Sequence, residues 1–290
     1  MDLILLLKAF VLGLVEGITE FLPISSTGHL IIAGDLLNFN DEKGKIFEIV
    51  IQLGAILAVC WAYRAKISQV LATTNEKTSQ QLIVNLGLAF LPAAIIGLAL
   101  HHQITDYLFK PLTVACALIL GGFAILIIER IAPQPTIAKV DDMDWKHALK
   151  IGFAQTIALI PGVSRSGATI LGGVIFGVSR QAATEFSFFL AIPVMFAATG
   201  FELVSNRNLL STKDFDLFAV GFIAAFISAL LVIKLFIRYV AKHNFTGFAW
   251  YRILFGIIVL AYYWWTNSLA ARHIFLATFL RALFSASGVK

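Results

Sequence analysis

The chain has 290 residues, of which 59% are hydrophobic and 13% are charged, and its mean hydropathy is +0.87. Soluble domains are typically about 25% charged, so this composition excludes an ordinary soluble enzyme, a disordered chain and a nucleic-acid-binding domain. The net charge of +5 fits an integral membrane protein, because Lys and Arg gather in the cytoplasmic loops of such proteins. We therefore expect an all-α, polytopic membrane protein.

The first apolar region, residues 3–38, is interrupted near its middle by Glu16-Gly-Ile-Thr-Glu20-Phe-Leu-Pro-Ile-Ser-Ser-Thr-Gly-His29. Proline removes a backbone donor and glycine permits a sharp turn, so this region predicts two half-helices around a polar break. Three full membrane spans are predicted to follow, because each segment has about 20 mostly apolar residues. They are residues 46–64, 82–100 and 112–131.

The second apolar region, residues 148–179, is interrupted by Gln155-Thr-Ile-Ala-Leu-Ile-Pro-Gly-Val-Ser-Arg-Ser-Gly-Ala-Thr169. Non-helical backbone at membrane depth is tolerated only where protein or a water-filled cavity surrounds it, so two breaks imply a cavity. Three more full spans are predicted at residues 183–204, 215–237 and 248–266. The tail, residues 267–290, could form a surface amphipathic helix or be a strain-specific extension.

The two interrupted regions match each other when one is shifted by 139 positions. Six of the 22 residues from Gly13 to Gly34 are then identical, including the pair Ser25 and Ser164. This match indicates an internal duplication within one membrane domain, residues 1–266. The first repeat is predicted at about 1–131 and the second at about 148–266.

The charge of the loops predicts how the repeats are oriented. Loops near 64–81, 129–150 and 238–252 carry three, four and three Lys or Arg, against one and two near 101–111 and 205–214. The richer loops are predicted to be cytoplasmic. The two broken regions would then enter from opposite faces as inverted-topology repeats, and their breaks would meet near the midplane.

Two carboxylates of the first break, Glu16 and Glu20, lie four residues apart on one helix face. An ionised carboxylate inside an apolar segment is costly unless it is paired, binds a cation or faces water. The pair predicts a divalent-cation site or an acid/base pair, and the alternative is a helix-end pair that reaches the surface. Mg²⁺ and Ca²⁺ both favour carboxylate oxygens.

Hydroxyl residues precede the second half-helix in both breaks. Such residues are often only N-caps, but here they accompany carboxylates, His29 and Arg165. A helix N-terminus offers free N–H groups to a phosphate, and a guanidinium matches phosphate oxygens bidentately. Two facing turns would therefore cradle a phosphate or diphosphate. His29 lies three residues after Ser26 and suits proton transfer or attack on phosphorus.

At these residues the sequence resembles the bacterial undecaprenyl-diphosphate phosphatases of the bacitracin-resistance type. The resemblance covers residues 1 to about 266, and its most specific parts are residues 16–29 and 161–169. It implies that the lipid carrier of cell-wall synthesis is dephosphorylated from the diphosphate to the monophosphate. It also implies a plasma-membrane enzyme with a divalent-cation requirement and an active site that opens outward.

The residues and the resemblance together give one set of predictions for the site. The predicted catalytic residues are Glu20, Ser26, His29 and Arg165, with Ser26 or His29 as the nucleophile, and Glu16 and Glu20 are predicted to hold Mg²⁺ or Ca²⁺. The predicted substrate-binding residues are Ser25, Thr27, Gly28, Ser164, Ser166, Gly167 and Thr169. The expected partners are a polyprenyl diphosphate and membrane lipids, not nucleic acid, and a homodimer stays open.

The alternative function is a secondary transporter or flippase of polyprenyl phosphates. Inverted repeats and broken helices that meet at the midplane are typical of transporters. Hydrolysis is favoured because a set of Ser, His, Arg and Glu exceeds what ion coupling requires.

Overall fold

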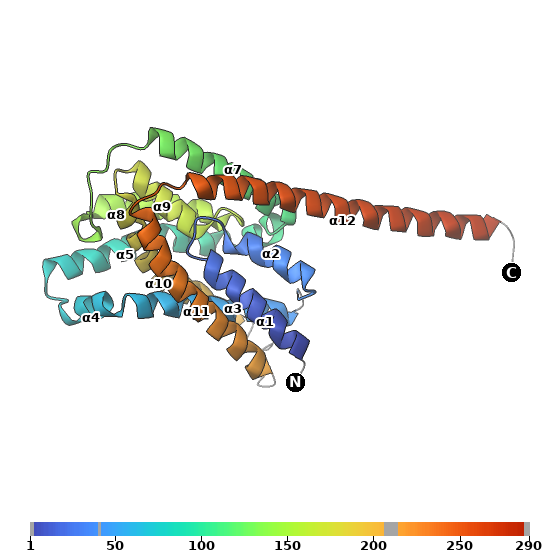
Figure 1. Ribbon diagram of the computed structural model, residues 1–290, viewed down its shortest axis with the longest axis horizontal. Coiled ribbons are helices and arrows are strands. Elements are labelled where there is room, and N and C mark those ends of the chain that lie inside the picture. The colour runs from blue at the N-terminus through green and yellow to red at the C-terminus, as the bar shows by residue number, and fades with distance from the viewer. Residues whose placement is uncertain (1–2, 40–41, 206–213, 287–290) are drawn as a thin grey trace.

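The structure, a computed structural model, describes residues 3–39, 42–205 and 214–286, and these are mostly helical (Figure 1). The fold class predicted from the sequence, an all-α polytopic membrane protein, is therefore confirmed. The helices in chain order are α1 (Leu3–Thr19), α2 (Ser26–Leu36), α3 (Glu42–Ala62), α4 (Arg64–Ala72), α5 (Lys77–Ala99), α6 (His101–Gln103), the π-helix η1 (Ile104–Leu108), α7 (Pro111–Ile131), the 3-10 helix η2 (Val140–Asp142), α8 (Trp145–Thr156), the 3-10 helix η3 (Ile157–Leu159), α9 (Arg165–Ile175), α10 (Arg180–Ser205), α11 (Phe215–Val240) and α12 (Thr246–Ala286).

Five helices of the described chain are long and apolar enough to cross a membrane, and they match five of the six predicted spans. They are α5, α7, α10, α11 and the first part of α12, Thr246–Thr266. The sixth prediction, residues 46–64, falls on α3, which is followed by α4 after a bend of 68°. Large apolar side chains such as Leu120 and Leu235 lie exposed on the outside of the bundle, as expected of a surface that contacts lipid.

Both predicted breaks are present. The first separates α1 from α2, and the second separates α8 and the short helix η3 from α9. In each region the two half-helices pack against one another. Figure 1 shows α1 and α2 toward one end of the bundle and α8 and α9 toward the other. The start of α8 is capped by Asp144, which accepts a hydrogen bond from the backbone N–H of His147, and this bond lowers the pKa of the Asp144 carboxyl.

The helices of the two halves interleave instead of forming separate bodies. α1 packs against α11, α8 against α5, and α7 against α12. The contacts are close because glycines face backbone at matching positions. A Cβ on Gly13 of α1 would lie 2.3 Å from the carbonyl oxygen of Gly221, and one on Gly152 of α8 would lie 2.8 Å from that of Ala89. The exchange of partners ties both interrupted regions into one core.

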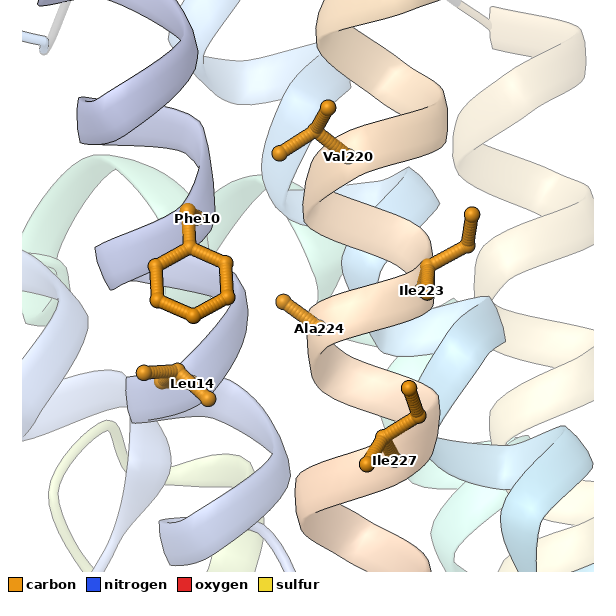
Figure 2. A pocket seen from close by; sticks show the side chains of 6 residues that line it. All are labelled: Phe10, Leu14, Val220, Ile223, Ala224 and Ile227. Atoms are coloured by element: carbon orange, nitrogen blue, oxygen red, sulfur yellow. The ribbon is translucent and has the colours of Figure 1, made fainter.

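An apolar groove separates the outer faces of α1 and α11 (Figure 2). It is lined by Phe10, Leu14, Val220, Ile223, Ala224 and Ile227. None of the predicted site residues lines it, so the groove belongs to the lipid-facing surface and not to the chemistry. The last helix, α12, continues beyond the predicted boundary at residue 266 and extends well past the rest of the bundle (Figure 1).

The close contact of α1 with α11 gives a test of the fold. We expect Gly13→Ala to lower the free energy of unfolding by about 1–3 kcal/mol, because the new methyl group overlaps the Gly221 carbonyl. The measurement is thermal unfolding of detergent-purified protein. Gly200→Ala is the matched control, because a Cβ there has open space. Equal stability of the two variants would contradict the packing.

Candidate active site

Each break ends in a serine that caps the following helix. Ser25 and Ser164 have positive φ angles of 70° and 76°, a region that non-glycine residues seldom adopt. Their hydroxyls accept hydrogen bonds from the backbone N–H groups of Gly28 (3.4 Å) and Gly167 (3.1 Å), respectively. The match between the two sequence regions therefore extends to the backbone. The caps also occupy four of the residues that we predict to bind substrate.

The two breaks touch each other at the backbone of Leu22. Ser166 donates a hydrogen bond of 2.8 Å to the Leu22 carbonyl, and Ser164 lies 3.0 Å from Ser166 and 3.5 Å from the same carbonyl. Ser166 is fully buried. Its hydroxyl thus adds a second hydrogen bond to a carbonyl of the first break that already accepts one from the backbone N–H of Ile24.

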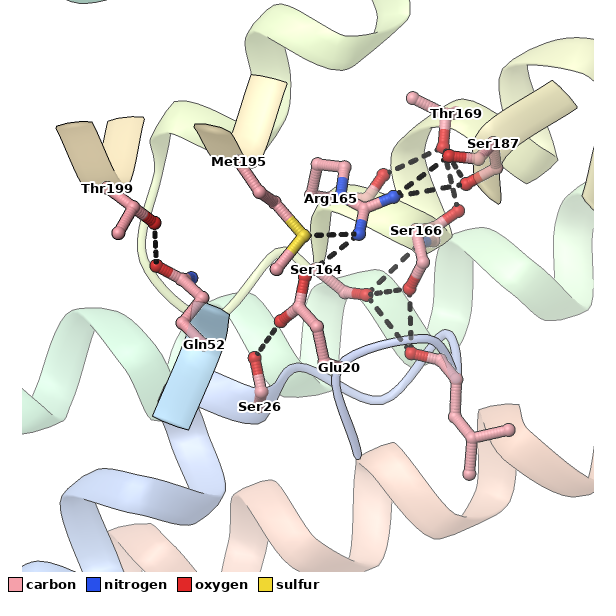
Figure 3. Close-up of polar contacts among 12 residues, drawn as sticks. Glu20, Ser26, Gln52, Ser164, Arg165, Ser166, Thr169, Ser187, Met195 and Thr199 are labelled. Carbon is pink, nitrogen blue, oxygen red and sulfur yellow. Dashed lines mark hydrogen bonds and ion pairs between the residues drawn. The ribbon is translucent and has the colours of Figure 1, made fainter. Parts of the chain in front are cut away.

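A chain of three polar side chains crosses between the breaks (Figure 3). Ser26 donates a hydrogen bond of 2.5 Å to one oxygen of Glu20, and the other oxygen lies 2.9 Å from Nη2 of Arg165. The side chains of Glu20 and Arg165 are only 8% and 13% exposed. Charged hydrogen bonds are strong when water is excluded, so this contact fixes a hydroxyl, a carboxylate and a guanidinium in one place.

Arg165 also contacts α10, a helix that was not predicted to contribute to the site. Its Nη1 donates to the carbonyl of Ser187 (3.0 Å), and its Nη2 lies 3.4 Å from the sulfur of Met195. Thr169, fully buried, donates a 2.7 Å hydrogen bond to the Ser187 hydroxyl. The guanidinium Nε is buried without a hydrogen-bond partner. The feature of the sequence that could have suggested this role is that Ser187 is a small polar residue inside the apolar span predicted at residues 183–204.

His29 contacts α12 and not the chain of Ser26, Glu20 and Arg165. Its Nδ1 lies 2.7 Å from the carbonyl oxygen of Ser25, and its Nε2 lies 2.6 Å from the hydroxyl of Tyr251. A carbonyl can only accept, so Nδ1 carries the proton, and in the neutral ring Nε2 accepts from Tyr251. The ring also stacks on Phe255 with centroids 4.1 Å apart.

Glu16, in α1 just before the first break, has a buried carboxylate oxygen without a partner. The residue is 1% exposed, and its Oε1 has no hydrogen-bond partner. Both oxygens of Glu20 are engaged, as described above. Across residues 3–39, 42–205 and 214–286, no group of three His, Cys, Asp or Glu residues is arranged to hold a metal ion. An ion here would need ligands beyond the protein, such as water or phosphate.

A second buried arginine corrects the loop analysis. The loop charge count assigned Arg252 to the basic loop at residues 238–252, but α12 begins at Thr246 and carries this residue into the bundle, where it is 1% exposed. Its five N–H groups donate to backbone carbonyls at 2.8–3.3 Å, which is how a buried cation without a carboxylate partner is stabilised. Without Arg252, that loop carries two basic residues, Arg238 and Lys242.

Comparison with known proteins identifies the family of the chain. Residues 9–258 match the model of the family described as bacitracin resistance protein BacA. The chain belongs to this family.

Relatives in this family share most of their length with the chain, and those compared carry the name undecaprenyl-diphosphatase. The protein of Methylobacillus flagellatus is 62% identical over 269 residues, which span 91% of this chain and 100% of the relative. The protein of Nitrosospira multiformis is 61% identical, with 90% and 96% covered. The protein of Cupriavidus metallidurans is 55% identical, with 91% and 97% covered.

The support that Ser187 gives to Thr169 and Arg165 is testable. We expect Ser187→Ala to lower turnover about fivefold, because the loss of one buried hydrogen bond of about 1 kcal/mol loosens the guanidinium. The measurement is steady-state hydrolysis of a prenyl diphosphate. Ser228→Ala, another buried serine that bonds only within α11, is the control. A wild-type rate in Ser187→Ala would show that the backbone carbonyl alone orients Arg165.

Proposed function

We propose that this protein hydrolyses undecaprenyl diphosphate to undecaprenyl phosphate and inorganic phosphate, which recycles the lipid carrier of cell-wall synthesis. The observation that carries the proposal is the contact of Ser26, Glu20 and Arg165 inside a membrane-embedded bundle. A nucleophile, a base and a phosphate-binding cation are the groups that phosphoryl transfer requires. The relatives named undecaprenyl-diphosphatase supply the identity of the substrate.

Substrate binding rests on Arg165 and on the N-termini of two helices. The free N–H groups at the starts of α2 and α9 and the unpartnered Nε of Arg165 are donors for the oxygens of the diphosphate. The half-buried Thr27 stands beside the first of these N-termini. Ser25, Ser164, Ser166 and Thr169 act mainly by shaping the two turns, since their hydroxyls are already bonded to protein.

The chemical step begins at Ser26. Glu20 removes the hydroxyl proton as the serine oxygen attacks the terminal phosphorus, and undecaprenyl phosphate departs with the bridging oxygen. Water then cleaves the phosphoserine and releases phosphate. The second route, attack by His29, would require Nε2 to leave the Tyr251 hydroxyl, so the contacts favour serine.

A divalent cation, Mg²⁺ or Ca²⁺, is part of the proposal. The unpartnered oxygen of buried Glu16 is available to such an ion. Glu20 would have to lose its bond to Ser26 or to Arg165 before it could bind the ion. When bound, the ion neutralises phosphate charge. Glu16 is the residue that would hold the ion through this oxygen.

The proposed location is the bacterial plasma membrane, with the site open to the outer face. The support is the basic character of the loops near 64–81 and 129–150, which favours a cytoplasmic position for them. The alternative of a transporter or flippase is not favoured, because it gives no role to a serine bonded to a carboxylate beside an arginine.

The reaction is tested by phosphate release from a short-chain prenyl diphosphate, with purified protein in detergent and no ion gradient. We expect Ser26→Ala, Glu20→Gln and Arg165→Lys each to lower kcat by at least about 100-fold, because they remove the nucleophile, the base and the bidentate cation. Asp142→Asn, at the exposed end of the 3-10 helix η2, is the control and should retain full activity.

A trapped phosphoenzyme distinguishes the two nucleophiles. We expect acid-stable phosphoserine at Ser26, whereas acid-labile phosphohistidine at His29 would overturn the serine route. Near-wild-type turnover of the Arg165→Lys and Glu20→Gln variants would overturn the site itself.

The cation proposal has a separate test. We expect chelation to abolish phosphate release and Glu16→Gln to raise the metal concentration for half-maximal activity by about tenfold or more. Wild-type activity after exhaustive chelation would refute a metal requirement. An unchanged metal dependence in Glu16→Gln would show that residues other than Glu16 hold the ion.

A further inference from the structure

Arg252 of α12 bonds to three separate segments at once, and two of these are the helix breaks. Its Nη1 donates to the carbonyls of Pro23 in the first break (3.1 Å) and Val163 in the second (2.8 Å). Its Nη2 donates to Gly162 of the second break (3.0 Å) and to Ala117 of α7 (3.1 Å). Its Nε donates to Leu118 of α7 (3.3 Å).

The carbonyls in the breaks are the ones that an interrupted helix leaves without partners. An unpaired buried carbonyl is costly, and water is scarce at membrane depth. A guanidinium can satisfy several carbonyls because its five N–H groups form a rigid planar fork. Lysine, with one nitrogen, could not reach acceptors on all sides of the fork.

The carbonyls that Arg252 binds lie a few residues from the reacting groups. Pro23 stands between Glu20 and Ser26, and Val163 is two residues before Arg165. One nitrogen of Arg252 therefore bonds to both chain segments that carry the contact between Glu20 and Arg165. We propose that Arg252 is a positioning residue that holds the two breaks in register, so that Glu20 and Ser26 meet Arg165 in productive geometry. The inference rests on the proposed function.

Arg252 does not serve as a second phosphate ligand in this arrangement. Each of its N–H groups already has a carbonyl partner, whereas Arg165 keeps a free donor. Gly121 of α7 makes the arrangement possible, because a Cβ there would lie 2.1 Å from Nη2 of Arg252. The atom it would meet is the end of a flexible side chain, so a methyl group at residue 121 displaces the guanidinium without a clash with backbone.

The test uses two substitutions that disturb the same fork by different means. Arg252→Lys keeps the charge and loses the fork, and Gly121→Ala keeps the arginine and pushes it aside. We expect both to lower kcat by about 100-fold, since a misplacement of about 1 Å can cost that much. KM should stay within about threefold, because the diphosphate ligands remain. Gly87→Ala, where a Cβ meets nothing within 4 Å, is the matched control in α5.

The double variant separates positioning from general destabilisation. In the Arg252→Lys background, Gly121→Ala should cost less than about twofold more, because the group it displaces is already gone. Rates are normalised to folded protein measured by size-exclusion chromatography and thermal unfolding. The proposal would be overturned if the losses of kcat in the two single variants multiplied in the double variant. It would also be overturned if the losses of activity were explained by the fraction of folded protein alone.

The outcome for the wild type distinguishes failure of the inference from failure of the proposed function. If the wild-type protein releases no phosphate under any metal condition, the proposed function fails. If the wild type is active and Arg252→Lys and Gly121→Ala match Gly87→Ala in kcat and KM, only the positioning role of Arg252 fails.

Discussion

The carbonyl and N–H groups that two helix breaks expose inside an apolar bundle are the constraint on which the rest of this structure depends. Lipid cannot hydrogen-bond them, so the protein must. Ser25 and Ser164 bond to N–H groups at the starts of α2 and α9, while Ser166 and Arg252 donate to carbonyls in the breaks. Because Ser166 of the second region bonds to the first break and Arg252 of α12 bonds to both breaks, satisfying the backbone also brings the two breaks together. The active site is a consequence of that requirement.

The two interrupted regions that match in sequence contribute unlike side chains to the site. Shifted by 139 positions, Glu16 corresponds to Gln155, Glu20 to Leu159, and Ser26 to Arg165. The backbone of the two caps is alike, as the φ angles of Ser25 and Ser164 show. The side chains differ, with a carboxylate and hydroxyl on one side and a cation on the other. Two like halves would place like charges together, which a buried site tolerates poorly. This difference yields one site with complementary charges.

The spans and the breaks could be predicted from sequence because local features specify them: apolar runs, proline and glycine. The hydroxyls of Ser25 and Ser164 were predicted to bind substrate, whereas the structure shows them as helix caps. Ser187, Tyr251 and Arg252 were missed because their partners lie far away in the chain. Arg252 was counted as a loop residue, since every residue has a backbone carbonyl and the sequence does not indicate which of them bind an arginine. His29 was grouped with Ser26 by its spacing of three residues, but its ring bonds and stacks mainly with residues of α12. Proximity along a helix did not determine where that side chain points.

The same contacts bear on whether the breaks move. Transport by alternating access requires one repeat to rock against the other around the midplane. Here five hydrogen bonds of a buried guanidinium and an ion pair join the two breaks and α7, and charged hydrogen bonds are worth about 1.5–3 kcal/mol each. Sliding the breaks apart would leave several buried carbonyls unpaired together. A fixed junction instead suits phosphoryl transfer, in which donors must be in place before charge develops on the phosphate.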